Sequence, residues 1–201
     1  MNEVIVSMNN ISKSFPGVKA LDHVKFELRS GEVMALLGEN GAGKSTLIKI
    51  LTGLYKADAG QIIFDHEERK FTTVQSAQKA GVSTIYQELN MIPYLTVSEN
   101  IFLGHYPYNQ SGIDWKKMHE DAQALIDEVG IDIDVKKTLN NYSTAKQQII
   151  SIIRAVNFNC KLLIMDEPTS SLDTNEVEIL FGIMDKMKAK GVSMIFISHR
   201  L

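Results

Sequence analysis

A short stretch near the start of the chain, residues 38–46, restricts the possible folds more than any other part of the sequence. It reads Gly-Glu-Asn-Gly-Ala-Gly-Lys-Ser-Thr, which fits the pattern G-x-x-x-x-G-K-[ST] of a phosphate-binding loop. Glycines let backbone N–H groups turn inward and surround a polyphosphate. Lys44 is placed to reach the β- and γ-phosphates, and the Ser45 hydroxyl to hold Mg²⁺. We expect phosphate contacts along the whole stretch: Gly38, Glu39, Asn40, Gly41, Ala42, Gly43, Lys44, Ser45 and Thr46.

The segments on either side of this loop support the same interpretation. Residues 33–37 are all apolar, which is typical of a buried parallel strand. Residues 47–51 predict a helix, whose positive N-terminal end favours bound phosphates. A chance glycine turn is the alternative, and it is disfavoured because strand, loop and helix follow in the required order.

Composition places the chain among globular proteins and excludes some functions. The chain has 201 residues, of which 44% are hydrophobic and 22% charged, with a net charge of −3. A nucleic-acid-binding protein normally carries a basic excess, so we expect no nucleic acid partner. No apolar run reaches the length of a membrane span, and the N-terminus lacks the pattern of a secretion signal, which favours the cytosol. The single Cys160 rules out an intrachain disulfide, and we expect it to be a small buried residue.

Hydrophobic periodicity predicts strands in the N-terminal third and helices in the middle. The expected strands are residues 4–11, 24–28, 61–64 and 82–86, with a break at Phe15-Pro16-Gly17 and a short helix at 73–80. Three helices should follow, over residues 96–103, 115–129 and 147–158. Thr96 with Glu99 forms a predicted capping box, and Asp114 and Gly130 should bound the second helix, with Trp115, Met118, Ala122, Leu125, Ile126 and Val129 on one face.

The C-terminal part returns to alternating strand and helix, at residues 162–165, 176–188 and 192–197. A β-rich start, a helical insertion and a parallel α/β core are therefore the expected layers.

Two carboxylates follow the apolar strand at residues 162–165, namely Asp166 and Glu167. In P-loop ATPases the aspartate at this place supports the Mg²⁺ site. Asp166 should do so through water, because Mg²⁺ keeps much of its hydration. Glu167 should project toward the γ-phosphate and polarise the attacking water. Helix capping or loop solvation is the alternative for each acid.

Gln87 and His199 follow two other predicted strands. Open α/β sheets bind ligands at the carboxyl ends of their strands. The amide of Gln87 could coordinate the metal and the lytic water, and the imidazole of His199 could donate a hydrogen bond to the γ-phosphate.

Taken in order, these motifs resemble the nucleotide-binding subunit of an ABC transporter over essentially the whole chain. The resemblance implies an α/β fold with a P-loop NTPase core, an antiparallel β subdomain and an inserted helical subdomain, an ATPase activity, and ATP and Mg²⁺ as cofactors. It implies that Phe15 stacks on adenine, although a buried core residue is a serious alternative. Gln87 matches the Q-loop, Ser171-Leu172-Asp173 the D-loop, and His199 the switch histidine.

Residues 15–21, 36–53 and 81–104 resemble monosaccharide importers of the ribose, galactose and xylose kind. The implied function is to power sugar import from the cytoplasmic face of the cell membrane. The implied partners are a second nucleotide-binding cassette, an integral membrane permease and, indirectly, an extracytoplasmic sugar-binding protein. Met91, Ile92, Pro93, Tyr94 and Leu95 could form the permease-docking patch or could pack inside the helical subdomain.

The signature motif of the family, Leu-Ser-Gly-Gly-Gln, is altered here to Tyr142-Ser143-Thr144-Ala145-Lys146. The resemblance implies that Ser143 contacts the γ-phosphate of ATP held by the opposite cassette. Ala145 adds a methyl group where backbone and phosphate should approach closely. Lys146 could help to bind phosphate or could simply be solvated.

The resemblance also implies domain bounds: an ATP-binding core over residues 1–87 and 159–201 and a helical subdomain over 88–158. Because family cassettes continue beyond the switch histidine, we expect the sequence to be the truncated first cassette of a tandem protein. Two rival functions stay open. One is a non-transport ABC ATPase, although Gln87 and Ser143 are too close in sequence for a long coiled coil. The other is a binding-only regulatory cassette.

Overall fold

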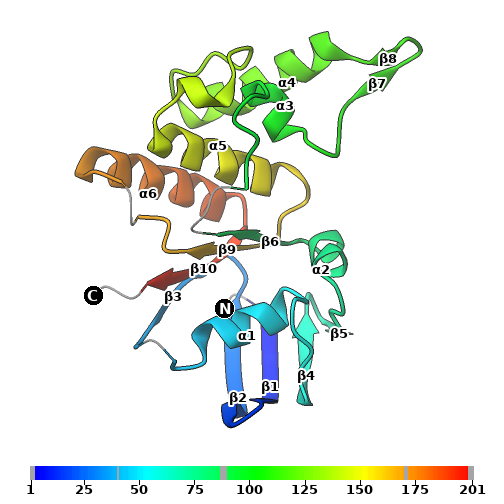
Figure 1. Cartoon of the computed structure of the whole chain (residues 1–201), viewed down its shortest axis with the longest axis vertical. Helices are drawn as coiled ribbons and strands as arrows, with labels where there is room; N and C mark the ends of the chain where they lie inside the picture. The colour runs from blue at the N-terminus through cyan, green and yellow to red at the C-terminus, as the bar shows by residue number, and fades with distance from the viewer. Residues whose placement is uncertain (1–2, 40, 87–89, 170–171, 199–201) are drawn as a thin grey trace. The chain divides into compact units, whose positions relative to one another are not determined.

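The structure is a computed structural model that describes residues 3–39, 41–86, 90–169 and 172–198. The chain packs as two compact units. The first unit comprises Met1–Thr84, Asn159–Glu167 and Met184–Leu201, and the second comprises Ile85–Phe158 and Pro168–Ile183. Figure 1 shows the elements of each unit. The predicted domain bounds stay a prediction.

An antiparallel sheet forms part of the first unit. Its strands, in the order β2-β1-β4-β5, are β2 (Val18–Arg29), β1 (Val4–Phe15), β4 (Ala59–Phe64) and β5 (Glu67–Arg69). The predicted break after Phe15 is confirmed, because a tight turn at Pro16 and Gly17 joins β1 to β2. Both strands run longer than the hydrophobic pattern indicates, since they continue as a paired hairpin to this turn. The short polar strand β5 was not predicted.

The second sheet of this unit has the strand order β3-β10-β9-β6. Its strands are β3 (Val33–Leu37), β10 (Ser193–Ser198), β9 (Leu162–Asp166) and β6 (Val82–Ile85). The pairs of β10 with β3 and with β9 are parallel, as predicted. The burial expected for residues 33–37 is wrong: Val33 is 39% and Leu37 49% exposed, because β3 is the end strand of this sheet among the described residues.

Helix α1 (Lys44–Leu51) lies between the two sheets (Figure 1). Leu47, Ile48, Ile50 and Leu51 are buried in one hydrophobic cluster with residues of both sheets. Helix α2 (Val74–Ala80) is capped by Thr73, whose hydroxyl accepts a hydrogen bond from the Ser76 N–H. Packing on two sides thus fixes the start of α1 relative to the sheets.

Cys160 is half-buried in the same unit, and burial raises the pKa of its thiol to about 11.

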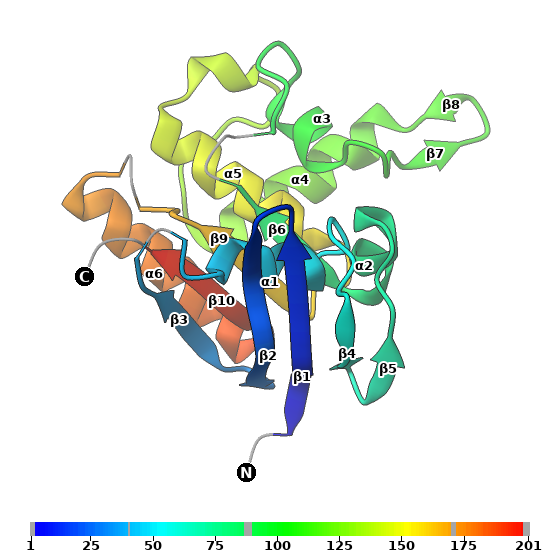
Figure 2. The same ribbon diagram turned by 60° about the horizontal axis from the view of Figure 1, so that its bottom comes forward.

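The second unit is mainly helical. It contains α3 (Val97–Ile101), α4 (Trp115–Val129), a 3₁₀ turn η1 (Leu139–Asn141), α5 (Thr144–Asn157) and the first part of α6 (Thr174–Ala189). A small hairpin of β7 (Tyr108–Asn109) and β8 (Gly112–Ile113) projects from its helices (Figure 2). Helix α3 packs on both α4 and α5.

The predicted caps of these helices are confirmed, but two details differ. Thr96 and Glu99 form the capping box of α3, and Asp114 and Gly130 bound α4. Helix α3 ends at Ile101 rather than at residue 103. Trp115, predicted on the same face of α4 as the buried Met118, is 49% exposed, because it is the first residue of the helix. Among the described residues, no helix is both long and apolar enough to cross a membrane.

Candidate functional site

The candidate site lies at one edge of the parallel sheet of the first unit. The register pairs Leu36 with Ile197 and Ile197 with Asp166, so β3, β10 and β9 end in nearly the same row. Gly38 begins the glycine loop directly after β3, and Glu167 directly follows β9. Because neighbouring strands are about 4.8 Å apart, the loop and the acidic pair are separated by roughly two strand spacings. This edge is where open α/β sheets bind ligands.

The glycine loop has a backbone that other residues would not adopt easily. The φ angles of Gly38, Gly41 and Gly43 are 147°, 86° and 84°. At Gly43 there is a second constraint, because an added Cβ would lie 2.8 Å from the Ala20 carbonyl oxygen and 2.8 Å from Leu21 Cδ2. The loop is therefore pressed against strand β2, and only glycine fits there.

The start of α1 presents backbone donors. Gly43 is the N-cap, and within the part of the chain that the structure describes no side chain caps the helix and no acidic residue lies in its first turn. Amide N–H groups of the first helical turn have no partner within the helix, and the helix dipole adds partial positive charge. These groups can bind an anion such as a phosphate.

Lys44 folds back over the loop. Its ammonium group donates hydrogen bonds to the carbonyl oxygens of Gly38 and of Glu39, the latter at 2.8 Å. Carbonyl oxygens hold the cation at the mouth of the loop, where phosphate oxygens can replace them. Ser45 is exposed beside it, and Thr46 is half-buried.

Asp166 is the last residue of β9 and is half-buried. Glu167 has a positive φ of 48°, and its N–H donates to the Ile197 carbonyl oxygen at 3.0 Å. A non-glycine residue rarely adopts such a φ, and active sites are one of the places where it is found. In the part of the chain that the structure describes, no three or more His, Cys, Asp or Glu side chains gather as a metal site. Mg²⁺ is usually bound by one or two carboxylates together with substrate phosphates and water, so Asp166 and the Ser45 hydroxyl fit it.

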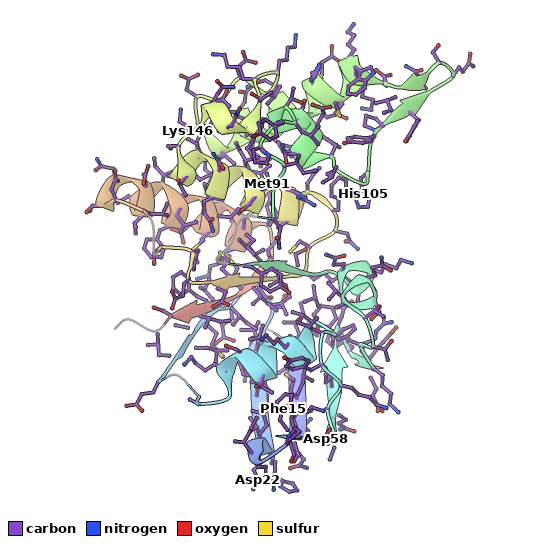
Figure 3. The ribbon with its side chains drawn as sticks, viewed as in Figure 1. Phe15, Asp22, Asp58, Met91, His105 and Lys146 are labelled. Atoms are coloured by element: carbon purple, nitrogen blue, oxygen red, sulfur yellow. The ribbon has the colours of Figure 1, made fainter. Side chains whose placement is uncertain are left out.

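Phe15 ends β1, at the tip of the hairpin. Its ring meets the ring of Tyr55 edge to face, with centroids 5.4 Å apart, and the Lys13 ammonium lies 5.6 Å from its centroid. The alternative of a buried core residue is wrong, since Phe15 is only half-buried. A half-buried ring can stack on a planar ligand. Figure 3 labels this residue.

In the second unit, Ser143 is the exposed N-cap of α5, and its hydroxyl accepts a hydrogen bond from the Lys146 N–H at 3.4 Å. Ala145 is only 4% exposed, so its methyl group packs inward and does not narrow the exposed helix start, contrary to the expectation. Lys146 is not simply solvated: its ammonium donates to the Asp132 carbonyl oxygen at 2.8 Å and lies 5.8 Å from the Tyr142 ring centroid.

Asp173 caps helix α6. Its N–H donates to a Glu176 carboxylate oxygen at 3.0 Å, and its own carboxylate accepts from the Glu176 N–H at 2.9 Å. A role of Asp173 in nucleotide contact therefore stays a prediction. Asn40, Gln87, Ser171 and His199 lie outside the described residues.

The predicted docking segment, residues 91–95, has an exposed centre. Ile92 is 41% and Tyr94 81% exposed, and Pro93 is exposed between them. The side chain of the buried Asn100 holds this segment by accepting from the Ile92 N–H at 2.8 Å and donating to the Ile92 carbonyl at 2.9 Å. The alternative, that the whole segment packs inside the helices, is therefore wrong for its centre.

Sequence reasoning missed the residues that surround Phe15. Asp58 and Tyr55 are far from Phe15 in sequence, and no local pattern marks them. They were found only because the folded chain brings them to the hairpin tip.

Comparison with known proteins places this geometry in a family. Residues 21–170 match the family described as ABC transporter. The fructose import ATP-binding protein FruK of Bifidobacterium longum is 52% identical over 98% of this chain and 39% of its own length. The galactofuranose transporter ATP-binding protein YtfR of Escherichia coli K12 is 48% identical over 100% of this chain and 40% of its own length. The chain thus spans about two fifths of the length of these relatives.

A crystal structure of the ADP conformation of an ATP-binding cassette of an ABC transporter is similar in fold. It has a TM-score of 0.84 and 26% identity, and the alignment covers 98% of this chain and 82% of that one. The glycine loop, the acidic pair and the fold agree with this match, and the chain belongs to the ABC transporter family, as one of its ATP-binding cassettes.

Proposed function

We propose that this chain binds and hydrolyses ATP and thereby powers the import of a monosaccharide through an ABC transporter. The observation that carries the proposal is the start of α1, which has no side-chain cap, beside Lys44, at the sheet edge where Asp166 ends β9 and Glu167 follows it. The names of the relatives, which refer to import of fructose and to a galactofuranose transporter, support a sugar as the cargo.

Binding begins at the glycine loop. Backbone N–H groups of residues 41–46 surround the β- and γ-phosphates, and Lys44 exchanges its two carbonyl contacts for phosphate oxygens. The exchange costs little, because one set of oxygen acceptors replaces another around an ammonium that stays in place. Phe15 stacks on the adenine and thereby orients the other end of the nucleotide.

Mg²⁺, when bound, neutralises charge on the β- and γ-phosphates, and the Ser45 hydroxyl and the Asp166 carboxylate would hold it. Glu167 accepts a proton from the attacking water. Its left-handed backbone, fixed by the hydrogen bond to Ile197, sets the direction of its side chain. Gln87 and His199 complete the predicted set by holding the water and the γ-phosphate.

A second cassette completes the site. Ser143 and the N–H groups at the start of α5 contact the γ-phosphate of the nucleotide held by that cassette. Closure excludes water, which strengthens every charge interaction in the site. Hydrolysis then separates the two cassettes.

The exposed centre of residues 91–95 is the proposed contact with an integral membrane permease at the cytoplasmic face of the membrane. Arg154 supports it from α5 by donating to the Asn90 carbonyl oxygen at 3.0 Å, and burial lowers the pKa of Arg154. An apolar surface on a held backbone suits a permanent partner, because little chain entropy is lost on docking.

Substitution of Glu167 tests the hydrolytic role. Loss of a positioned base costs about 10²- to 10⁴-fold in rate. Glu167→Gln should therefore lower phosphate release by this factor and leave the Kd for Mg-ATP nearly unchanged, as measured by calorimetric titration. Glu178→Gln removes a carboxylate from the exposed face of α6 and serves as the matched control. Unimpaired turnover in Glu167→Gln would contradict the assignment.

A further inference from the structure

The residues around Phe15 form a connected group, of which the functional proposal uses only Phe15 itself. They come from three segments of the first unit: β1, the chain that follows α1, and the approach to β4. The group comprises Lys13, Phe15, Tyr55 and Asp58. Figure 3 shows Phe15 and Asp58 near each other at the hairpin.

Asp58 holds the three residues that precede Phe15. One carboxylate oxygen accepts from the Lys13 ammonium at 2.7 Å, and the other accepts from the Ser14 N–H at 2.7 Å. The Asp58 N–H in turn donates to the Ser12 carbonyl oxygen at 2.9 Å. Asp58, which is distant in sequence, therefore fixes the backbone of the residues just before Phe15 and the side chain of Lys13.

The ion pair lies against the ring itself. The Lys13 ammonium that Asp58 binds is the one 5.6 Å from the Phe15 centroid, and the Lys13 side chain is only 18% exposed. Cation–π attraction strengthens when the cation is desolvated. The hydrogen bond from Lys13, followed by the one from the Ser14 backbone, lowers the pKa of Asp58, so its carboxylate is ionised at neutral pH.

The same hairpin is tied to the phosphate loop. Lys13 pairs with Leu21 and Ser14 with Lys19, so Ala20 is an extra residue of β2 at this irregularity. Such bulges re-aim the strand and its side chains. Ala20 is also the residue whose carbonyl oxygen lies so close to Gly43 that an added Cβ there would be 2.8 Å from it. Tyr55, which contacts Phe15, donates its N–H to the Lys49 carbonyl oxygen near the end of α1.

We propose that Asp58 is a positioning residue for the nucleotide base: through Lys13 and the Ser14 backbone it holds the Phe15 ring in place relative to the phosphate loop. The inference rests on the proposed function of Phe15. Asp58 does not touch the nucleotide, and its effect is confined to ligands that carry a base.

Two ligands separate this role from a general one. Mg-ATP has both base and phosphates, whereas inorganic tripolyphosphate has the phosphates alone. Titration calorimetry on the 201-residue chain gives Kd for each. Phe15→Ala should weaken Mg-ATP binding by about 5- to 100-fold, which is the range for loss of one stacked base. Asp58→Asn should weaken it by about 2- to 5-fold, as expected for a partly exposed ion pair. Neither should change the Kd for tripolyphosphate.

Asp22 provides the matched control. It lies in β2 of the same hairpin, is exposed, and forms an ion pair with Lys19 and a hydrogen bond with His23, both at 2.6 Å. Asp22→Asn makes the same chemical change without touching Lys13 or Ser14, and it should leave both affinities unchanged. A second variant is available if Asp58→Asn folds poorly. Lys13→Met keeps the apolar stem of the side chain and removes its charge, and it should weaken Mg-ATP binding by the same factor.

The double variant shows whether Asp58 acts through the ring. In the Phe15→Ala background, Asp58→Asn should cause no further loss of Mg-ATP affinity. An equal loss for Mg-ATP and tripolyphosphate would overturn the proposal, because Asp58 would then act on the loop. The proposal would also be overturned if Phe15→Ala weakened Mg-ATP binding and Asp58→Asn did not, although the role of Phe15 would then stand. If Phe15→Ala left the Kd for Mg-ATP unchanged, Phe15 would have no base-stacking role, and the inference about Asp58 would fail with it.

Discussion

The starts of helices α1 and α5 are both predicted to contact phosphate, yet they are built in opposite ways. Gly43 begins α1 with no side-chain cap. Ser143 begins α5 and uses its own hydroxyl as the cap. The lysine near each start also differs: Lys44 donates to carbonyl oxygens of its own loop, whereas Lys146 donates to the carbonyl oxygen of Asp132, which is 14 residues away.

This difference separates a site that is ready for an anion from one that is already satisfied. At α1, N–H groups without partners would be costly to bury, and a phosphate supplies the missing acceptors. At α5, a phosphate has to compete with the Ser143 hydroxyl, although the 3.4 Å hydrogen bond from Lys146 is long and therefore weak. We propose that a single chain binds nucleotide at α1, and that α5 contributes only when a second cassette brings its phosphate.

The largest expected effect comes from the two lysines. Lys44→Ala removes a charge-assisted contact and should raise the Kd for Mg-ATP by about 10- to 100-fold. Lys146→Ala should leave this Kd unchanged and lower the free energy of unfolding by about 1 kcal/mol, because one hydrogen bond to Asp132 is lost. Calorimetric titration and thermal unfolding of both variants measure these values. Equal losses of affinity would contradict the distinction between the two helix starts.

Two glycines of the loop give the next effect. Gly41→Ala and Gly43→Ala share the cost of a side chain at positive φ, which is roughly 1 kcal/mol or more. At Gly41 nothing in the described part of the chain lies within 4 Å of an added Cβ. At Gly43 the new methyl group would lie 2.8 Å from the Ala20 carbonyl oxygen. Gly43→Ala should therefore be the more destabilising by about 1–3 kcal/mol in chemical unfolding. Equal stabilities would show that the loop does not press on β2.

The smallest effect is expected at α5. Ser143→Ala removes an N-cap, which costs about 0.5–2 kcal/mol, and the long hydrogen bond places it at the low end. The Kd of the single chain for Mg-ATP should not change. Thermal unfolding measures the loss of stability, and calorimetric titration measures the Kd. A raised Kd for Mg-ATP would mean that Ser143 contacts nucleotide within its own chain.

The glycine loop and its flanking elements could be predicted because local rules fix them. Strand, loop and helix are adjacent in sequence, and the two glycines that the pattern demands, Gly38 and Gly43, both have positive φ. The capping box at Thr96 and the caps of α4 were predictable for the same reason, since each involves residues within one helical turn.

What depends on distant parts of the chain could not be predicted. The exposure of β3 follows from its place at the end of the sheet, which its apolar sequence does not reveal. Lys146 has a partner 14 residues away, and Asp58 one 45 residues away. Ala145 was expected to face phosphate, but a helix start exposes only some of its residues, and packing decided that Ala145 is buried.

Amide hydrogen exchange of the single chain, with and without Mg-ATP, tests the central claim most directly. We predict slower exchange at residues 41–46, whose N–H groups gain phosphate acceptors, and no change at residues 143–146. No protection at residues 41–46, or equal protection at both helix starts, would contradict the account.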